Sequence, residues 1–150
     1  MARVSGVESE LQMIDFPSVG KTGGEDCPFC NYHPIVHENE RAFSCWDTAP
    51  VTPGHLLILP KRHIPDFFAI LPEELTDVWA LLELGQTLIV RQHLPNGFNL
   101  GVNVGVAAGQ TVSHAHLHVI PRYRGDVDDP SGGVRAVIPR HRPEALHPSR

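Results

Sequence analysis

The sequence predicts a single α+β domain in which short antiparallel strands pack against one long helix. Three observations support this prediction: short apolar runs separated by polar breaks before residue 60, a helical apolar period that begins at Pro72, and histidines that alternate with apolar residues from His114. The chain has 150 residues, of which 41% are hydrophobic, so it can bury one core without disulfide support. We expect no second domain.

The two ends of the chain are expected to lie outside the folded domain. Residues 1–24 mix Ser, Gly, Glu and Lys without apolar periodicity, which is typical of a flexible leader. We expect the domain over residues 25–138 and a mobile tail over residues 139–150. The segment Gly20–Thr22 has the letters of a phosphate-binding P-loop, but the glycine required upstream is replaced by Asp15. We therefore exclude that motif.

Three short strands are expected first, at Ile35–Val36, Ala42–Trp46 and His55–Leu59, where apolar residues are bounded by polar or turn-forming ones. The breaks between them are Glu38–Glu40 and Thr52–Gly54. Breaks this short join neighbouring antiparallel strands, so the sequence favours a small antiparallel meander.

A long helix is expected next. Pro72 suits the first helical turn, and the acidic Glu73 and Glu74 interact favourably with the positive end of the helix dipole. Between Pro72 and Arg91, apolar residues recur at helical spacing: Leu75, Val78, Trp79, Leu82, Leu88 and Ile89. The turn-forming Pro95–Gly97 ends the helix, and Phe98–Val104 is expected to be a further strand.

The segment from His114 to Ile120 is the most informative part of the chain. Alternate side chains of a strand point to opposite faces, so His114, His116 and His118 are expected to share one face. Three titratable rings on a half-buried strand cost desolvation that Val or Thr would avoid, so the pattern indicates a chemical role. The alternative is an exposed strand that is rich in histidine by chance.

The segment Gly109–Arg122, Gly-Gln-Thr-Val-Ser-His-Ala-His-Leu-His-Val-Ile-Pro-Arg, resembles the signature of the histidine triad superfamily of nucleotide hydrolases and transferases. Two further segments agree with it: Trp46–His63, with its Pro-Gly-His turn and Pro-Lys-Arg-His block, and Asn99–Gly105. The resemblance covers about residues 25–122. It implies an α+β fold with a five-stranded antiparallel sheet, one long helix, a short helix and a homodimer.

The resemblance also implies a covalent reaction at phosphorus. A neutral imidazole nitrogen can attack a phosphorus atom that carries a good leaving group, which divides one displacement into two easier steps. His116 matches the nucleophile of the family and needs a hydrogen bond that fixes its tautomer. His118 is placed to donate to a phosphate oxygen or to the leaving group, and His55 matches a histidine that supports the triad.

Gln110 and Thr111, together with the backbone N–H groups around Gly109, are candidates to line the phosphates as fixed donors. We count Gln110 among the catalytic candidates for this reason. Thr111 also matches a Ser or Thr that the family uses on the leaving-group side. The alternative is that both side chains simply close a turn.

The resemblance assigns further substrate contacts to three other residues. Asp47 matches a carboxylate that accepts from ribose hydroxyls, and Asn103 matches a polar contact on the phosphate side. Arg122 follows the triad directly and is expected to contact phosphate, which favours dinucleoside polyphosphates over nucleoside phosphoramidates. Alternatively, Asp47 forms an Asx-turn and Asn103 caps a strand end.

The pair Cys27 and Cys30 forms a C-x₂-C motif. In a chain expected in a reducing compartment, such a pair more often holds zinc than forms a disulfide. Two thiolates need two more ligands, and Cys45 is better interpreted as a small buried side chain of a strand. His33 or His37, close in sequence, could complete the site, and a metal-free thiol pair is the other alternative.

The resemblance implies instead that His63 and His114 close a structural zinc site with the two cysteines. This assignment leaves His116 and His118 for phosphate chemistry. A catalytic zinc held by all three triad histidines is excluded by geometry, because alternate residues on one strand span about 13 Å from first to last.

Composition limits the partners and the compartment. The 12 Lys and Arg against 17 Asp and Glu give a net charge of −5, which argues against a broad nucleic-acid or anionic-membrane surface. No apolar run approaches the length of a membrane span, and the odd number of 3 cysteines fits a reducing compartment. We expect a soluble cytoplasmic protein whose partners are a nucleotide and a second copy of the chain.

The expected function is hydrolysis at the α-phosphate of dinucleoside polyphosphates or nucleoside phosphoramidates, which releases a nucleoside monophosphate through a nucleotidyl-histidine. The first alternative is a dinucleoside polyphosphate phosphorylase or nucleotidyltransferase, in which phosphate resolves the intermediate. The second is a non-catalytic nucleotide-binding or scaffold protein. An intact His116 argues against the second, since a binding module has no chemical need for the nucleophile.

Overall fold

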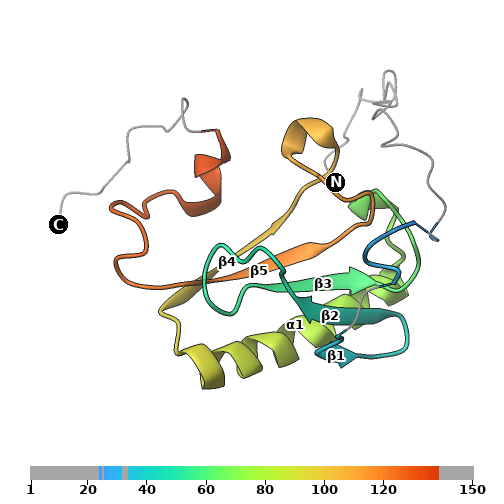
Figure 1. Cartoon of the computed structure of the whole chain (residues 1–150), viewed down its shortest axis with the longest axis horizontal. Helices are drawn as coiled ribbons and strands as arrows, with labels where there is room; N and C mark the ends of the chain where they lie inside the picture. The colour runs from blue at the N-terminus through green and yellow to red at the C-terminus, as the bar shows by residue number, and fades with distance from the viewer. Residues whose placement is uncertain (1–23, 25, 32–33, 139–150) are drawn as a thin grey trace, which may run out of the picture.

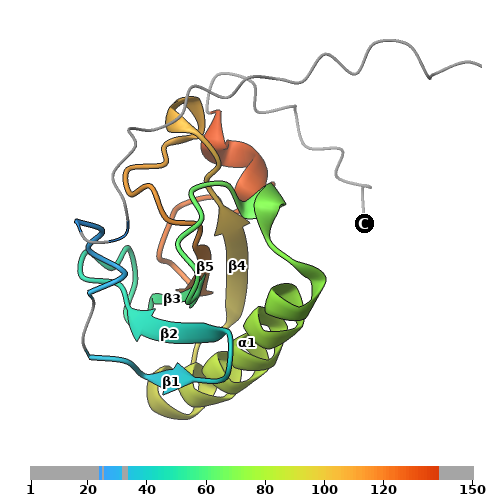
Figure 2. The same cartoon turned by 90° about the vertical axis from the view of Figure 1, so that its right-hand side faces the viewer.

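The computed structural model describes residues 24, 26–31 and 34–138. They form a five-stranded antiparallel sheet in the order β1-β2-β3-β5-β4, and the long helix lies along one face of it (Figures 1 and 2). The strands are β1 (His37–Glu38), β2 (Ala42–Trp46), β3 (Leu56–Pro60), β4 (Gly97–Val102) and β5 (Leu117–Arg122). The helices are α1 (Pro72–His93) and three short 3₁₀ helices, η1 (Phe67–Ala69), η2 (Val106–Ala108) and η3 (Gly133–Val137). The predicted sheet and long helix are confirmed.

Among the predicted strands only β2 has the expected boundaries, and β3 is shifted by one residue from the expected His55–Leu59 to Leu56–Pro60. The first strand, β1, begins at His37, and Val36 flanks it, with its N–H donating to the carbonyl of Ser44 at 2.8 Å. β4 ends at Val102 instead of Val104, because the last residue pair of its ladder joins Val102 to Leu117. The chain leaves the sheet where its partner strand begins.

The prediction of one continuous strand from His114 is wrong for its first three residues, because β5 begins at Leu117. β3 continues to Pro60, but its last pair with β5 is Ile58 with Leu117, and β4 also ends opposite Leu117, at Val102. The segment before β5 bonds elsewhere instead, with the Ala115 N–H donating to the Ile64 carbonyl at 2.6 Å. His114 and His116 therefore do not share a regular strand face with His118.

The sheet is apolar on both faces in its centre. The cluster under α1 consists of Ala42, Leu56, Ile58, Val78, Leu81, Leu82, Ile89 and Val119. A smaller cluster covers the opposite face and consists of Phe43, Cys45, Leu57 and Leu59, with Phe29 packed against it. His118 pairs with Leu57 across the β3–β5 ladder. Because side chains alternate along β5, His118 lies on the face away from α1.

Contacts at the start of α1 connect the helix to the block after β3. The carboxylate of Glu74 accepts from the Arg62 guanidinium at 2.7 and 2.8 Å and from the Leu71 N–H at 2.9 Å. The helix ends before Leu94, which adopts the left-handed conformation (φ 50°), as the following Pro95–Gly97 turn predicts.

The remaining predictions about chain organisation concern residues outside this description. The leader predicted over residues 1–24, apart from Gly24, and the tail predicted over residues 139–150 lie outside the described residues. No helix within the described part of the chain is both long enough and apolar enough to cross a membrane.

Candidate active site and metal centre

His116 lies directly before β5, and its side chain is 6% exposed. Its Nδ1 lies 2.7 Å from the carbonyl oxygen of His114. A carbonyl only accepts hydrogen bonds, so in the neutral ring Nδ1 carries the proton and Nε2 keeps its lone pair. The Phe29 ring packs against the imidazole edge-on, with the ring centroids 5.2 Å apart. This is the arrangement that a nucleophilic imidazole requires.

His55, directly before β3, and His118, in β5, form a hydrogen-bonded pair. His55 Nε2 lies 3.0 Å from His118 Nδ1. The backbone N–H of Val51 donates to His55 Nδ1 at 3.3 Å, so Nδ1 is an acceptor and the proton of neutral His55 lies on Nε2. That Nε2–H donates to His118 Nδ1, which places the proton of His118 on its own Nε2.

These two hydrogen bonds, from Val51 to His55 and from His55 to His118, form a relay. The Nε2–H of His118 is the donor that remains at its end. The atom is buried and has no hydrogen-bond partner among the described residues. A buried donor without a partner costs about 1–3 kcal/mol, so the site favours a ligand that supplies an acceptor. The rings of His116 and His118 have their centroids 4.8 Å apart, which places this donor on the ring next to the free nitrogen of His116.

Asp47 follows β2 and lies beside the pair. One carboxylate oxygen is 3.4 Å from His55 Nδ1, and the other accepts from the Ala49 N–H at 2.8 Å. The second contact is the Asx-turn named above as the alternative. The ligand atoms of Asp47, His55 and His118 lie within 4.8 Å of one another. Because the two imidazoles already bond to each other, this group is better described as a proton relay than as a metal site.

Burial determines the protonation of the relay. It lowers the pKa of His118 to about 4, and the neighbouring rings of His116 and His55 act in the same direction. Burial also lowers the pKa of His55, against the opposing effect of the Asp47 carboxylate. Both rings are therefore neutral near pH 7, so His118 acts there as a hydrogen-bond donor without a positive charge.

Gln110 is buried and makes three hydrogen bonds to the backbone. Its Oε1 accepts from the Gly105 N–H at 2.8 Å, and its Nε2 donates to the carbonyls of Pro65 and Val112 at 2.7 and 3.1 Å. Both Nε2 hydrogens are therefore engaged. This is the turn-closing arrangement, in which Gln110 shapes the loop before the triad and has no N–H left for a phosphate.

The backbone N–H groups around Gly109 are also engaged in this loop, since those of Gly109 and Gln110 donate to the carbonyls of Val106 and Gly105 at 3.0 and 3.2 Å. Gly109 ends η2 in the left-handed conformation (φ 86°), and Thr111 is exposed. Asn103 follows the last residue of β4, whose ladder pairs Val102 with Leu117. Asn103 and His116 therefore each lie one residue beyond the end of the β4–β5 ladder.

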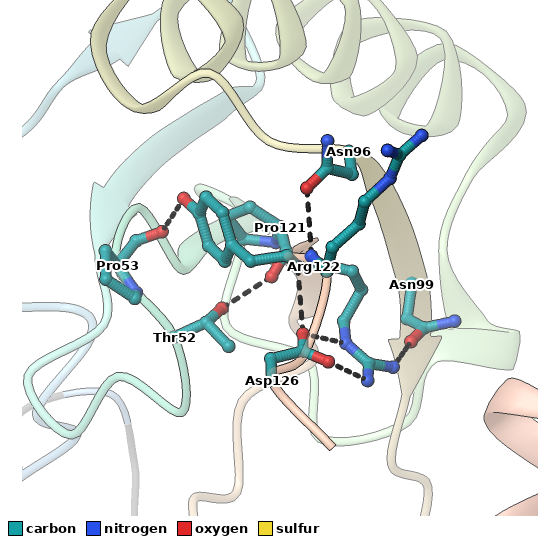
Figure 3. Close-up of polar contacts among 9 residues, drawn as sticks. Thr52, Pro53, Asn96, Asn99, Pro121, Arg122 and Asp126 are labelled. Carbon is teal, nitrogen blue, oxygen red and sulfur yellow. Dashed lines mark hydrogen bonds and ion pairs between the residues drawn. The ribbon is translucent and has the colours of Figure 1, made fainter. Parts of the chain in front are cut away.

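Arg122 lies four residues beyond His118 on β5, which corresponds to about 13 Å along a strand. Its guanidinium donates twice to Asp126, at 2.7 and 2.8 Å, and once to Asn99, at 2.6 Å (Figure 3). The hydrogen bonds from Arg122, together with that from the Tyr123 N–H, lower the pKa of Asp126 to about 2. Arg122 therefore holds the loop after β5, and the phosphate contact expected of it has no support in the described contacts.

The second centre brings together the four residues named by the resemblance. The ligand atoms of Cys27, Cys30, His63 and His114 lie within 4.8 Å of one another. His114 is fully buried, and its Nε2 lies 2.8 Å from the carbonyl oxygen of Pro60. Its lone pair is thus on Nδ1, which faces the two sulfurs at 3.5 and 3.6 Å. Cys30 Sγ lies 3.4 Å from Nδ1 of His63.

The donor set fits a zinc ion. Two thiols and two imidazoles match the tetrahedral preference of Zn²⁺, and four protein ligands leave no open position. Burial, together with the neighbouring Cys27, raises the pKa of Cys30 to about 11, so the paired thiolates need a cation to offset their charge. The alternative ligand His37 lies in β1, outside this group, and the alternative His33 lies outside the described residues.

Several functional contacts come from groups that the sequence analysis does not identify. Backbone groups determine which ring nitrogen carries the proton: the Val51 N–H does so for His55, the Pro60 carbonyl for His114 and the His114 carbonyl for His116. Phe29 contacts the rings of both His114 and His116, with centroid distances of 6.0 and 5.2 Å. Its position inside the C-x₂-C motif is the one signal that could have indicated this contact.

Comparison with known proteins agrees with this geometry. The family model described as HIT domain matches residues 30–125. Over 80 residues the chain is 39% identical to the bis(5′-nucleosyl)-tetraphosphatase (asymmetrical) of Schizosaccharomyces pombe. That alignment covers 53% of this chain and 44% of the relative, so the chain spans less than half the length of that protein.

Two solved structures share the fold. A HIT family protein from Bacillus anthracis matches with a TM-score of 0.64 and 38% identity, over 68% of this chain and 77% of that one. A zinc-bound histidine triad family protein from Mycobacterium smegmatis matches with a TM-score of 0.58 and 35% identity, over 69% and 80%. Because the family model covers most of the domain and all three triad histidines, the chain belongs to the HIT domain family.

Proposed function

We propose that this protein cleaves dinucleoside polyphosphates at an α-phosphate through a nucleotidyl intermediate on His116. The observation that carries the proposal is the pairing of two nitrogens on adjacent rings. His116 presents a lone pair on Nε2, because its Nδ1–H is held by a carbonyl. His118 presents a buried Nε2–H that has no partner among the described residues. One accepts a bond to phosphorus, and the other donates to a phosphate oxygen.

The reaction proceeds in two displacements. In the first, His116 Nε2 forms a bond to the α-phosphorus and the bond from phosphorus to the bridging oxygen breaks, so that the polyphosphate of the second nucleotide leaves with the electron pair. In the second, water attacks the same phosphorus, the P–N bond breaks, and the water proton passes to solvent. The released products are a nucleoside monophosphate and the remaining nucleotide, and His116 returns to its neutral form.

The neutrality of His118 favours an anhydride as substrate. A polyphosphate is a good leaving group that departs as an anion, so it needs hydrogen bonding rather than full protonation. A phosphoramidate leaves as an amine and needs a proton from an acid. With its pKa lowered to about 4 by burial, His118 is predominantly neutral near pH 7. The relative named as a tetraphosphatase supports the same substrate class.

We assign the remaining contacts as follows. Asp47 accepts from ribose hydroxyls through the oxygen that faces His55. Asn103 and Thr111 contact the phosphates, whereas the N–H groups of Gly109 and Gln110 are already used by carbonyls of the same loop. Gln110 holds the loop that presents them, and its three backbone bonds support this positioning role.

We further propose that zinc occupies the four-residue group of Cys27, Cys30, His63 and His114. When bound, the ion supplies structural cross-linking between the cysteine motif and the segment before β5. The zinc-bound relative from Mycobacterium smegmatis supports this choice of metal. His114 belongs to this centre and also holds His116 through its carbonyl, so the metal ligand contributes to the orientation of the nucleophile.

We propose a homodimer formed by α1 and β4. β4 is an edge strand of the sheet, so one side of its backbone is open to pairing with a second β4 related by two-fold symmetry. Beside it lies a groove of about 380 Å³ lined in part by Leu82, Phe98 and Leu100, with Trp79 59% exposed on α1.

Light scattering on eluted protein should give twice the chain mass. Leu100→Arg should give monomer, whereas Leu84→Arg, exposed on α1 outside this groove, should not.

Product chromatography tests the activity. Zinc-loaded protein and its His116→Asn variant are incubated with diadenosine polyphosphates and an adenosine phosphoramidate, with and without phosphate. We expect adenosine monophosphate from the diadenosine substrates and its loss in the variant. A nucleoside diphosphate that forms only in phosphate would identify the phosphorylase alternative. Equal or absent release from both proteins would favour the non-catalytic binding alternative and contradict the proposal.

A further inference from the structure

Two hydrogen bonds join the turn before β3 to the end of β5. The Thr52 hydroxyl donates to the Pro121 carbonyl, and the Tyr123 hydroxyl donates to the Pro53 carbonyl, each at 2.7 Å (Figure 3). Tyr123 is itself held, because its N–H donates to the Asp126 carboxylate at 2.9 Å. Two successive residues of the turn, Thr52 and Pro53, are thus hydrogen-bonded to Pro121 in β5 and to Tyr123 directly after it.

The fastened turn is the one that carries the donor to His55. The His55 N–H donates to the Thr52 carbonyl at 3.2 Å, and Gly54 between them has a φ of 83°, as a Pro-Gly β-turn of type II requires. Val51 directly precedes Thr52, and its N–H donates to His55 Nδ1. Fixing Thr52 and Pro53 therefore fixes the position of this N–H relative to the ring.

We propose that Thr52 and Tyr123 are positioning residues that keep the proton of His118 on Nε2. The inference deepens the proposed function and rests on it for the catalytic meaning of that proton. While the Val51 N–H points at His55 Nδ1, the ring must donate from Nε2, and His118 must then donate from its own Nε2. The orientation of one backbone N–H is transmitted through two rings to the atom that faces the phosphate.

A competing arrangement of the same groups explains why the turn needs fastening. Asp47 has a carboxylate oxygen 3.4 Å from His55 Nδ1, which accepts a hydrogen bond from Nδ1–H if the Val51 N–H withdraws. His55 then carries its proton on Nδ1, and its Nε2 becomes an acceptor. His118 must in turn donate from Nδ1, which leaves a lone pair on Nε2. The number of protons is unchanged, but a lone pair now faces the phosphate oxygen.

Nitrogen NMR of the zinc-loaded full chain tests this directly, because the ¹⁵N shifts of a neutral histidine distinguish its two tautomers. We expect Nε2–H forms of both His55 and His118 in the natural protein. Removing one hydrogen bond, in Thr52→Val or Tyr123→Phe, should shift the tautomer ratio about two- to tenfold towards Nδ1–H. Thr52→Ser keeps the hydroxyl and should restore the original ratio. Thr76→Val, which removes a similar hydroxyl-to-carbonyl bond on α1, should change nothing.

Kinetics supply the second measurement. With a diadenosine substrate, the double variant Thr52→Val/Tyr123→Phe should lose kcat about tenfold or more, whereas KM should change less than about twofold, because an altered tautomer weakens transition-state stabilisation more than binding. Unchanged tautomers in the double variant would overturn the inference whatever the activity. Altered tautomers in a protein that cleaves no diadenosine substrate would instead contradict the proposed function and leave the positioning role standing.

Discussion

At the scale of residues, the carbonyls of Pro60 and His114 each accept from a histidine ring, at 2.8 and 2.7 Å. The first leaves the lone pair of His114 on Nδ1, towards the sulfurs, and the second leaves that of His116 on Nε2. The Val51 N–H has the opposite effect on His55. It donates to Nδ1, so Nδ1 must carry the lone pair and the proton lies on Nε2. Identical side chains therefore offer a metal ligand, a nucleophile and a donor.

The depressed pKa of His118 predicts an acid-sensitive stability. The unfolded chain binds a proton at His118 near the usual value of 6.5, whereas the folded chain does so only near 4. The unfolded state therefore binds more protons in this window, and the stability from neutral His118 is lost as pH falls from about 6.5 to 4. Urea unfolding at several pH values should show less of this loss in His118→Asn. An NMR titration midpoint of His118 at or above 6.5 would contradict the account.

The identities of the site residues could be predicted from the sequence, because side-chain spacing and motif order are visible in it. The proton positions could not. They depend on carbonyl and N–H groups whose distance from the rings is set by folding, as when Pro60 meets His114 across 54 positions of chain. The hydrogen-bond partners of Gln110 and Arg122 could not be predicted for the same reason, since Pro65, Val112, Asp126 and Asn99 carry no motif.

At the scale of elements, the block after β3 is held to α1 by the pair of Arg62 and Glu74. The Glu74 side chain is 5% exposed and the Arg62 side chain 45% exposed, and Arg62 supplies two of the hydrogen bonds that the buried carboxylate accepts, the third coming from the Leu71 N–H. Because His63 follows Arg62, the same contact positions one side of the metal centre.

Loss of the Glu74 charge should destabilise the fold measurably. Hydrogen bonds with Arg62 lower the pKa of Glu74, so their contribution is present above about pH 4.5 and is lost as pH falls through the lower folded value. We expect Glu74→Gln to reduce the free energy of unfolding by about 1–3 kcal/mol at pH 7, and by less in acid. The neighbouring Glu73→Gln should cost less than about 0.5 kcal/mol. Equal effects of the two variants in urea unfolding would exclude this role.

Both ends of the helix could be predicted because the residues that start and stop it are close in sequence: Pro72 begins it, and the turn Pro95–Gly97 follows its end. The start of β5 was not, since the alternating pattern continues back to His114 while the ladder stops at Leu117. Pattern alone describes which side chains alternate. Whether a strand continues depends on its partners, and here β4 ends at Val102 while the Ala115 N–H bonds to the Ile64 carbonyl.

At the scale of the whole molecule, the proposed metal centre joins segments that are far apart in sequence. It brings the cysteine motif near residue 30 to the block after β3 and to the segment before β5. A closed four-ligand site of this kind contributes directly to folding free energy, because the unfolded chain does not preform it. We therefore expect the metal to stabilise the segment that carries His116 rather than to take part in the reaction.

Metal removal gives a corresponding prediction. Elemental analysis should find one zinc ion per chain, and a strong chelator should lower the melting temperature and the rate of cleavage together. Cys30→Ala should lose the metal, whereas Cys45→Ala should keep it, because Cys45 lies in the core of β2 outside the ligand group. Full zinc occupancy in Cys30→Ala would show that the ion is held elsewhere.

The central claim is that His116 forms a bond to phosphorus, and mass spectrometry of rapidly quenched protein tests it most directly. Zinc-loaded protein is mixed with a diadenosine polyphosphate, stopped within one turnover and digested without acid. We predict a peptide heavier by one adenylyl group, with the modification on His116, and no such peptide from His116→Asn. Monophosphate release without any modified histidine, or with the same release from His116→Asn, would contradict the account.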